Sequence, residues 1–135
     1  MLISGDHLLG RVSLYFDYGW TPDPVGEFLD SLDRVAQLDA RLCLAGHGRT
    51  FTDVRAHIDA NRALVAERTG RVRAAVAEHG PITAYDIVPL LHGEALTQLT
   101  AGWWLPETLS YLRHLAVTGV VAVTEAGETE RWALA

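Results

Sequence analysis

The stretch RLCLAGHG, residues 41–48, sets the pattern of the fold, because a short apolar run ends there in two glycines around one histidine. A continuous apolar run of this length, bounded by glycines, is typical of a strand buried on both faces. The opening stretch LISGDH, residues 2–7, has the same form and ends in Gly5 and Asp6. We therefore predict two buried strands, each followed by one potential metal ligand.

The two strand-end residues, Asp6 and His47, are the candidate metal ligands of this chain. Functional groups of layered α/β folds gather at strand ends, so we expect the two side chains to lie together. Each residue also has a structural interpretation when it is taken alone. Asp6 can stabilise a turn, and the glycines beside His47 can serve a tight bend of the backbone.

The other histidines and the single cysteine are expected to have structural roles. If the first strand continues past Asp6, His7 points to the opposite face of that strand. Cys43 lies in the second predicted strand, where a small buried hydrophobe is far commoner than a reactive thiol. The remaining histidines show no metal-ligand spacing and are expected at the surface or in packing: His57, His79, His92 and His114.

Length and composition indicate a soluble globular protein. The 135 residues, 49% of them apolar, suffice for one ordinary domain or two small ones. No apolar run approaches the roughly 20 residues of a membrane span, and no basic-then-apolar start marks a signal peptide. One cysteine cannot form an internal disulfide, so we expect a cytoplasmic protein. The net charge of −6 argues against general affinity for phosphate backbones.

Hydrophobic spacing predicts the remaining elements of the first half. Val12–Phe16 has the composition of a strand, and residues 25–39 have apolar side chains at helical spacing after two prolines. Residues 53–79 contain no proline and only one glycine, and they predict a long helix. Gly80 and Pro81 then mark the best domain boundary.

The last 55 or so residues have the outline of a winged helix. Thr83 precedes Asp86 by three positions, an acidic variant of the capping box, and predicts a helix over 84–91. Pro106 occupies a plausible first helical position, and Gly119 a C-terminal cap, for a second helix. Two strands around the turn Ala126-Gly127-Glu128 are expected to close the chain.

Two groups of aromatic residues are candidates for contact surfaces. Tyr15, Tyr18 and Trp20 cluster on one loop and could line a pocket for an acyl or aryl group; packing of the loop onto its own sheet is equally open. The adjacent Trp103 and Trp104 suggest one ring in a core and the other at a contact surface, within the protein or across a dimer.

Taken in order, these pieces resemble the C-terminal part of a metallo-β-lactamase-fold hydrolase with a winged-helix-like tail. The resemblance spans nearly all the chain and rests on SGDHLL at 4–9, on DPVGEFLDSLDRVAQLDARLCLAGHG at 23–48, on FTD at 51–53 and on LSYLRHLAVTGVV at 109–121. It implies an α/β (α+β) fold with three parts. These are the C-terminal portion of an αββα sandwich over 1–52, a long connecting helix over 53–79 and a winged-helix-like domain over 80–135.

The resemblance also implies the role of the two strand-end residues. Hydrolases of this family hold two metal ions with an HxHxDH motif, a further histidine, a bridging aspartate and a last histidine. By resemblance Asp6 corresponds to the bridging aspartate and His47 to the last histidine. The HxHxDH motif does not occur in these 135 residues. The resemblance therefore implies a fragment that lacks the N-terminal half and is inactive alone.

In the intact relative the resemblance implies two zinc ions and hydrolysis of a small-molecule ester or thioester, or of a phosphodiester bond. The Tyr15–Trp20 loop would help to shape the entrance to that site. The expected partner of the chain is the N-terminal half of the enzyme or a second copy of the chain. No association with a membrane is expected.

Two other functions remain open. An interaction or dimerisation module would use the apolar surface of Trp103, Trp104 and the long helix. A nucleic-acid-binding winged helix is disfavoured by charge, because residues 81–135 contain six acidic and two basic side chains.

Overall fold

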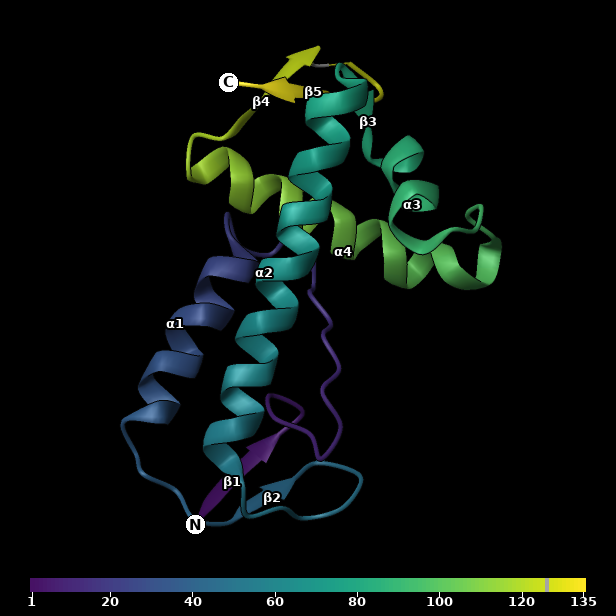
Figure 1. The fold of residues 1–135 in the computed structure, drawn as a ribbon. Coiled ribbons are helices and arrows are strands. Elements are labelled where there is room, and N and C mark those ends of the chain that lie inside the picture. The colour runs from purple at the N-terminus through teal and green to yellow at the C-terminus, as the bar shows by residue number, and fades with distance from the viewer. Residues whose placement is uncertain (126) are drawn as a thin grey trace. The chain divides into compact units, whose positions relative to one another are not determined.

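The computed structural model describes residues 1–125 and 127–135. In chain order its elements are β1 (Leu2–Gly5), α1 (Pro24–Ala36), β2 (Cys43–Ala45), α2 (Val54–His79), β3 (Ile82–Thr83), α3 (Ala84–His92), α4 (Gln98–Val117), β4 (Val121–Glu125) and β5 (Arg131–Leu134), as Figure 1 shows.

The chain forms two compact units. Unit 1 consists of Met1–Leu14 and Glu27–Val65, and unit 2 consists of Tyr15–Gly26 and Ala66–Ala135. Helix α2, which the sequence predicted, contributes its first half to unit 1 and its second half to unit 2. The division at 1–52, 53–79 and 80–135 stays a prediction.

The sheet of unit 1 consists of β1 and β2, which run parallel and side by side (Figure 1). Leu2 is paired with Cys43, and the pairing is closed by backbone hydrogen bonds at both ends. Leu2 N donates to Leu42 O at 2.8 Å, and Gly46 N donates to Gly5 O at 2.7 Å. Because the strands are parallel, their carboxyl ends meet at one edge. The positions of the two predicted strands are therefore confirmed. The predicted burial was wrong for β1, because Leu2 packs against the core while Ile3, on the opposite face, is 75% exposed.

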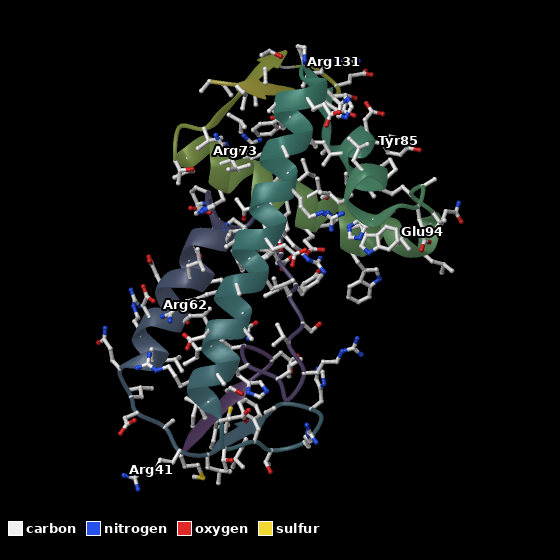
Figure 2. All side chains as sticks on the ribbon, in the orientation of Figure 1. Arg41, Arg62, Arg73, Tyr85, Glu94 and Arg131 are labelled. Carbon is white, nitrogen blue, oxygen red and sulfur yellow. The ribbon has the colours of Figure 1, made fainter. Side chains whose placement is uncertain are left out.

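The core of unit 1 forms between this sheet, α1 and the first half of α2. Its buried members come from all of these elements and the loops beside them: Leu8, Leu32, Cys43, Phe51, Val54 and Ile58. On the outside of the same unit, Arg62 of α2 donates to Asp33 of α1, and Figure 2 labels this arginine. The predicted helix over 25–39 is confirmed, although α1 ends at Ala36.

The strand predicted over Val12–Phe16 was wrong, since these residues have no regular secondary structure. Phe16 is buried and packs edge-to-face on Tyr111, with ring centroids 5.6 Å apart, inside unit 2. The β-type composition of this segment therefore serves side-chain packing. An extended segment becomes a strand only where a neighbouring segment pairs with its backbone.

Unit 2 packs α3 and α4 with the second half of α2 and an antiparallel sheet of strand order β3-β5-β4. The predicted cap of α3 is confirmed, because Thr83 Oγ1 accepts a hydrogen bond from Asp86 N at 3.1 Å. The short strand β3, which places Ile82 opposite the fully buried Trp132, was not predicted. β4 and β5 confirm the two predicted strands, and the turn between them includes Ala126, which lies outside the described residues.

Helix α4 begins at Gln98, well before the predicted start at Pro106. A capping box explains the difference: Thr97 Oγ1 accepts from Thr100 N at 3.2 Å, and Thr97 N donates to Thr100 Oγ1 at 3.0 Å. Pro106 thus lies inside the helix. The predicted cap at Gly119 is confirmed by its left-handed φ of 76°.

Among the helices of residues 1–125 and 127–135, none has both the length and the apolar character of a membrane span. Helices α3 and α4 and the three-stranded sheet agree with the expected elements of the tail. The winged-helix assignment itself stays a prediction.

Candidate metal centre

Asp6 and His47 come together at the carboxyl edge of the sheet of unit 1. Asp6 Oδ1 lies 3.5 Å from His47 Nε2, although the residues are about forty positions apart in the sequence. Both side chains are open to solvent, with 76% of Asp6 and 69% of His47 exposed. A carboxylate oxygen and an imidazole nitrogen thus point to the same small region of surface.

Glycines permit this approach. A Cβ atom on Gly46 would lie 2.5 Å from Asp6 Oδ1 and 2.9 Å from the carbonyl carbon of Gly5, so only glycine fits beside Asp6. Gly5 and Gly48 have φ values of 54° and 81°, in the left-handed region that favours glycine. The sharp turns after β1 and β2 therefore depend on the glycines that flank the two candidate ligands.

Ser4, which was not predicted as a site residue, holds the loop that carries Asp6. Its hydroxyl donates to Leu8 O at 2.7 Å and accepts from the buried Cys43 thiol at 3.2 Å. These bonds tie the turn after β1 to β2. A serine directly before Gly5 was the available signal, because its hydroxyl can bond nearby backbone groups. Cys43 is buried, as expected.

His57 of helix α2 contacts the loop that follows β1. Its ring stacks on Phe51 with centroids 4.0 Å apart, and its Nε2 lies 3.3 Å from Gly10 O. Nδ1 lies 3.2 Å from Asp53 O, one turn earlier in the chain. The histidine thus joins the loop after β1 to the start of α2 in a packing role.

His7 faces away from the pair and towards α1. Its Nε2 lies 3.2 Å from Ser31 Oγ, and its ring meets Phe28 edge-to-face at 5.1 Å. Burial lowers the pKa of His7, which favours the neutral imidazole. β1 ends at Gly5, so the turn, and not strand alternation, sets this direction.

The chemistry of the Asp6–His47 pair fits a metal of the zinc type. Zinc accepts carboxylate oxygen and imidazole nitrogen and takes four ligands in most sites. The pair supplies two ligands. Within residues 1–125 and 127–135 no group of three or more His, Cys, Asp or Glu side chains could hold a metal ion. The described residues therefore form part of a possible centre, and Zn²⁺ would need further ligands.

The predicted pocket residues belong to unit 2 and not to the unit that holds Asp6 and His47. Tyr15 lies edge-to-face on Trp103, at 5.7 Å between ring centroids. Tyr18 accepts a hydrogen bond from Arg113 Nε at 3.3 Å. Trp20 is 82% exposed. A role of these three residues in substrate binding stays a prediction.

Unit 2 also contains a buried polar network that the sequence did not reveal. Glu107, only 10% exposed at its side chain, accepts from Arg68 Nη1 at 2.5 Å and from the Tyr111 hydroxyl at 3.0 Å. Burial, followed by the charge of Glu107, raises the pKa of Tyr111 far above its ordinary value. The nearby His92 stacks on Trp104 with centroids 4.1 Å apart. The Glu107 carboxylate thus accepts from both a guanidinium and a hydroxyl inside unit 2, as in a structural element.

Two crystal structures resemble this chain over almost its whole length. A β-lactamase domain protein from Burkholderia ambifaria has 32% sequence identity and a TM-score of 0.87, and the match covers 99% of this chain and 41% of that protein. A metallo-β-lactamase family protein from Thermus thermophilus has 30% identity and a TM-score of 0.82, with 99% of this chain and 42% of that protein covered.

The chain thus spans about two fifths of the length of these two proteins. No protein-family model and no curated protein matches the sequence.

Proposed function

The chain has the fold of the C-terminal part of a metallo-β-lactamase family protein, and from this premise we propose that it supplies two ligands, Asp6 and His47, to a dinuclear zinc centre. The observation that carries the proposal is the 3.5 Å approach of Asp6 Oδ1 to His47 Nε2 at one strand edge. The reaction proposed for the whole enzyme is hydrolysis of an ester, thioester or phosphodiester bond.

The zinc ions would supply the hydrolytic chemistry, by lowering the pKa of a water molecule and polarising the substrate oxygen. The chain's own contribution is the position of the ligands. Asp6 offers two carboxylate oxygens, which suits a ligand shared by two cations, and His47 offers Nε2. Gly46 keeps the space beside Asp6 open, and Ser4 fixes the preceding turn.

Two ligands leave most coordination positions to water, so we expect weak metal binding and negligible hydrolysis by the 135-residue chain alone. A titration with Zn²⁺ that is monitored by NMR should shift the signals of the His47 ring and of Asp6 first. The double variant Asp6→Ala with His47→Ala should remove these shifts. A matched control is Asp17→Ala with His79→Ala, which removes one exposed carboxylate and one imidazole in unit 2. Equal loss in both variants would contradict the assignment.

A second experiment tests the hydrolase itself. Joining the chain to the HxHxDH-containing part of a metallo-β-lactamase family protein should restore two bound zinc ions and turnover of an ester, thioester or phosphodiester substrate. Elemental analysis and activity assays measure both. The double alanine variant should abolish turnover in the joined protein while the fold persists. Unchanged turnover in that variant would show that these residues are not ligands.

The alternative of a nucleic-acid-binding tail is tested by fluorescence anisotropy with a labelled random duplex. We expect no binding tighter than the roughly 10⁻⁴–10⁻⁶ M of non-specific binders, because the tail is acidic. Salt-sensitive binding well below micromolar would overturn this expectation.

A further inference from the structure

An open hollow of about 500 Å³ lies in unit 2 between the loop at 18–22 and helix α4. Pro22, Ala116 and Val117 line it with apolar groups, and Tyr18 and Arg113 add polar ones. The volume falls within the range of about 300–1,000 Å³ that is usual for small-molecule sites. Neither the metal ligands nor the buried network around Glu107 takes part in this hollow.

Arg113 is held firmly beside the hollow. Its Nη2 donates to both carboxylate oxygens of Glu130, at 2.8 and 3.1 Å, and its Nε donates to the Tyr18 hydroxyl at 3.3 Å. The guanidinium also lies over the ring of Trp132, 5.1 Å from the centroid. The hydrogen bond to Tyr18 is the largest cause that raises the pKa of Arg113, so the group stays charged.

Three donors of this wall have no acceptor among the described residues. Arg113 Nη1 takes part in no hydrogen bond or ion pair there, and the Tyr18 hydroxyl accepts a hydrogen bond without donating one. Thr21 Oγ1 is buried and unpartnered within the same described residues. Arg113 Nη1 can only donate hydrogen bonds, and a hydroxyl can donate one, so these groups suit a partner that accepts, such as an ionised carboxylate.

Charge favours a singly charged group. Glu130 already balances the guanidinium, so a dianion such as a phosphate monoester would meet a carboxylate beside the only cation that lines the hollow in the described part of the chain. A carboxylate can accept from Arg113 Nη1 and from the Tyr18 hydroxyl, and the apolar groups of α4 and Pro22 suit an aliphatic or aromatic body. We propose that this hollow binds a small organic monocarboxylate, with its oxygens on Arg113 Nη1 and the Tyr18 hydroxyl.

Binding is tested on the full chain without added metal, so the result does not depend on the proposed zinc centre. The probes are hexanoate and benzoate, with hexanamide and benzamide as neutral matches of the same shape. NMR titration should show binding of the acids at least about tenfold tighter than binding of the amides, since a charge-assisted hydrogen bond is worth more than a neutral one. The shifted signals should belong to residues 18–22 and 113–117.

Three variants locate the site. Tyr18→Phe keeps Arg113 and removes one donor, and should weaken acid binding about fivefold. Ala116→Phe fills the hollow and should abolish binding, while Arg113→Gln should weaken it at least about tenfold. Arg73→Gln is the control, because Arg73 is an exposed arginine of α2, labelled in Figure 2, that does not line the hollow.

Arg113→Gln also loses Glu130 and Trp132 as partners, so the fold of every variant is checked from its amide spectrum. Tyr18→Phe and Ala116→Phe keep the test decisive if Arg113→Gln unfolds. Equal affinity for acids and amides, unchanged binding in Tyr18→Phe and Ala116→Phe, or no binding at about 10 mM probe would each overturn the proposal.

Discussion

Units 1 and 2 each contain a carboxylate beside a nitrogen-bearing side chain, and the two pairs differ in every other respect. Asp6 and His47 lie at a strand edge in solvent. Glu107 lies inside unit 2, bonded to Arg68 and to the Tyr111 hydroxyl. The exposed pair keeps its lone pairs open to solvent. The buried Glu107 Oε1 accepts hydrogen bonds from Arg68 and from the Tyr111 hydroxyl. Availability to a ligand, and not the residue type, separates a candidate site from a structural element.

This contrast also predicts where stability lies. A buried charge depends on its partners, because leaving one of them unpaired is strongly unfavourable. An exposed pair at 3.5 Å contributes little to folding, since water solvates both groups. Substitutions of Glu107 and its partners should therefore cost stability, and substitutions of Asp6 and His47 should affect metal binding alone.

The largest effect is expected for Glu107→Ala. The substitution leaves Arg68 and the Tyr111 hydroxyl without their partner inside unit 2. It should lower the free energy of unfolding by about 3 kcal/mol. This value is near the lower end for a broken buried ion pair, because Arg68 is partly exposed. Urea unfolding followed by circular dichroism measures it. A loss below about 1 kcal/mol would show that the network is not structural.

Gly46→Ala should have the next largest effect. The new Cβ would meet the Gly5 carbonyl carbon and Asp6 Oδ1, and β2 must shift to relieve these contacts. We expect a loss of about 1–2 kcal/mol in urea unfolding, with NMR changes confined to β1, β2 and their loops. Gly70→Ala is the matched control, because a Cβ at Gly70 would meet no atom within 4 Å. Equal losses at both positions would contradict the close approach.

Tyr111→Phe removes a single hydrogen bond to Glu107 and keeps the Arg68 pair and the ring packing. The expected loss is about 1 kcal/mol. Combining it with Glu107→Ala gives a double-mutant cycle, and the two losses should not add, because they remove the same bond. If the two losses in the free energy of unfolding add, the stabilising contribution of Tyr111 comes from the contacts of its ring and not from the hydrogen bond to Glu107.

The double substitution Asp6→Ala with His47→Ala should change the free energy of unfolding by less than about 0.5 kcal/mol, since both side chains are exposed. Urea unfolding without metal is the measurement. A loss above about 1 kcal/mol would mean that the pair is part of the fold, and would remove the contrast with Glu107.

The smallest effect concerns His92. Burial is the largest cause that lowers its pKa below 6.5, so the folded state binds a proton less readily than the unfolded state. Its contribution to stability is therefore complete above pH 6.5 and declines as the pH falls through the folded pKa. An NMR titration of the His92 ring should give a lower midpoint in buffer than in urea. In His92→Gln, the free energy of unfolding should depend less on pH in this range. Identical midpoints would exclude the effect.

Much of the local structure could be predicted from the sequence, because it depends on neighbouring residues. Three such features each involve residues only a few positions apart: the cap between Thr83 and Asp86, the helix end at Gly119, and the two strands that end at glycines. The start of α4 was missed because Pro106 is a familiar first helical residue, although a threonine pair upstream forms the better cap. Such errors follow from competing local signals.

The sequence by itself determined the two candidate strand-end ligands and the resemblance to a metallo-β-lactamase fold, since both rest on short patterns of residue types. Only the tertiary structure decided that Asp6 and His47 lie 3.5 Å apart, and that Phe16 packs on Tyr111 and forms no strand. It alone also paired Glu107 with Arg68 and held Arg113 beside Tyr18. The physical reason is that these contacts join residues far apart in the chain, and packing and strand pairing, which no local pattern records, bring them together.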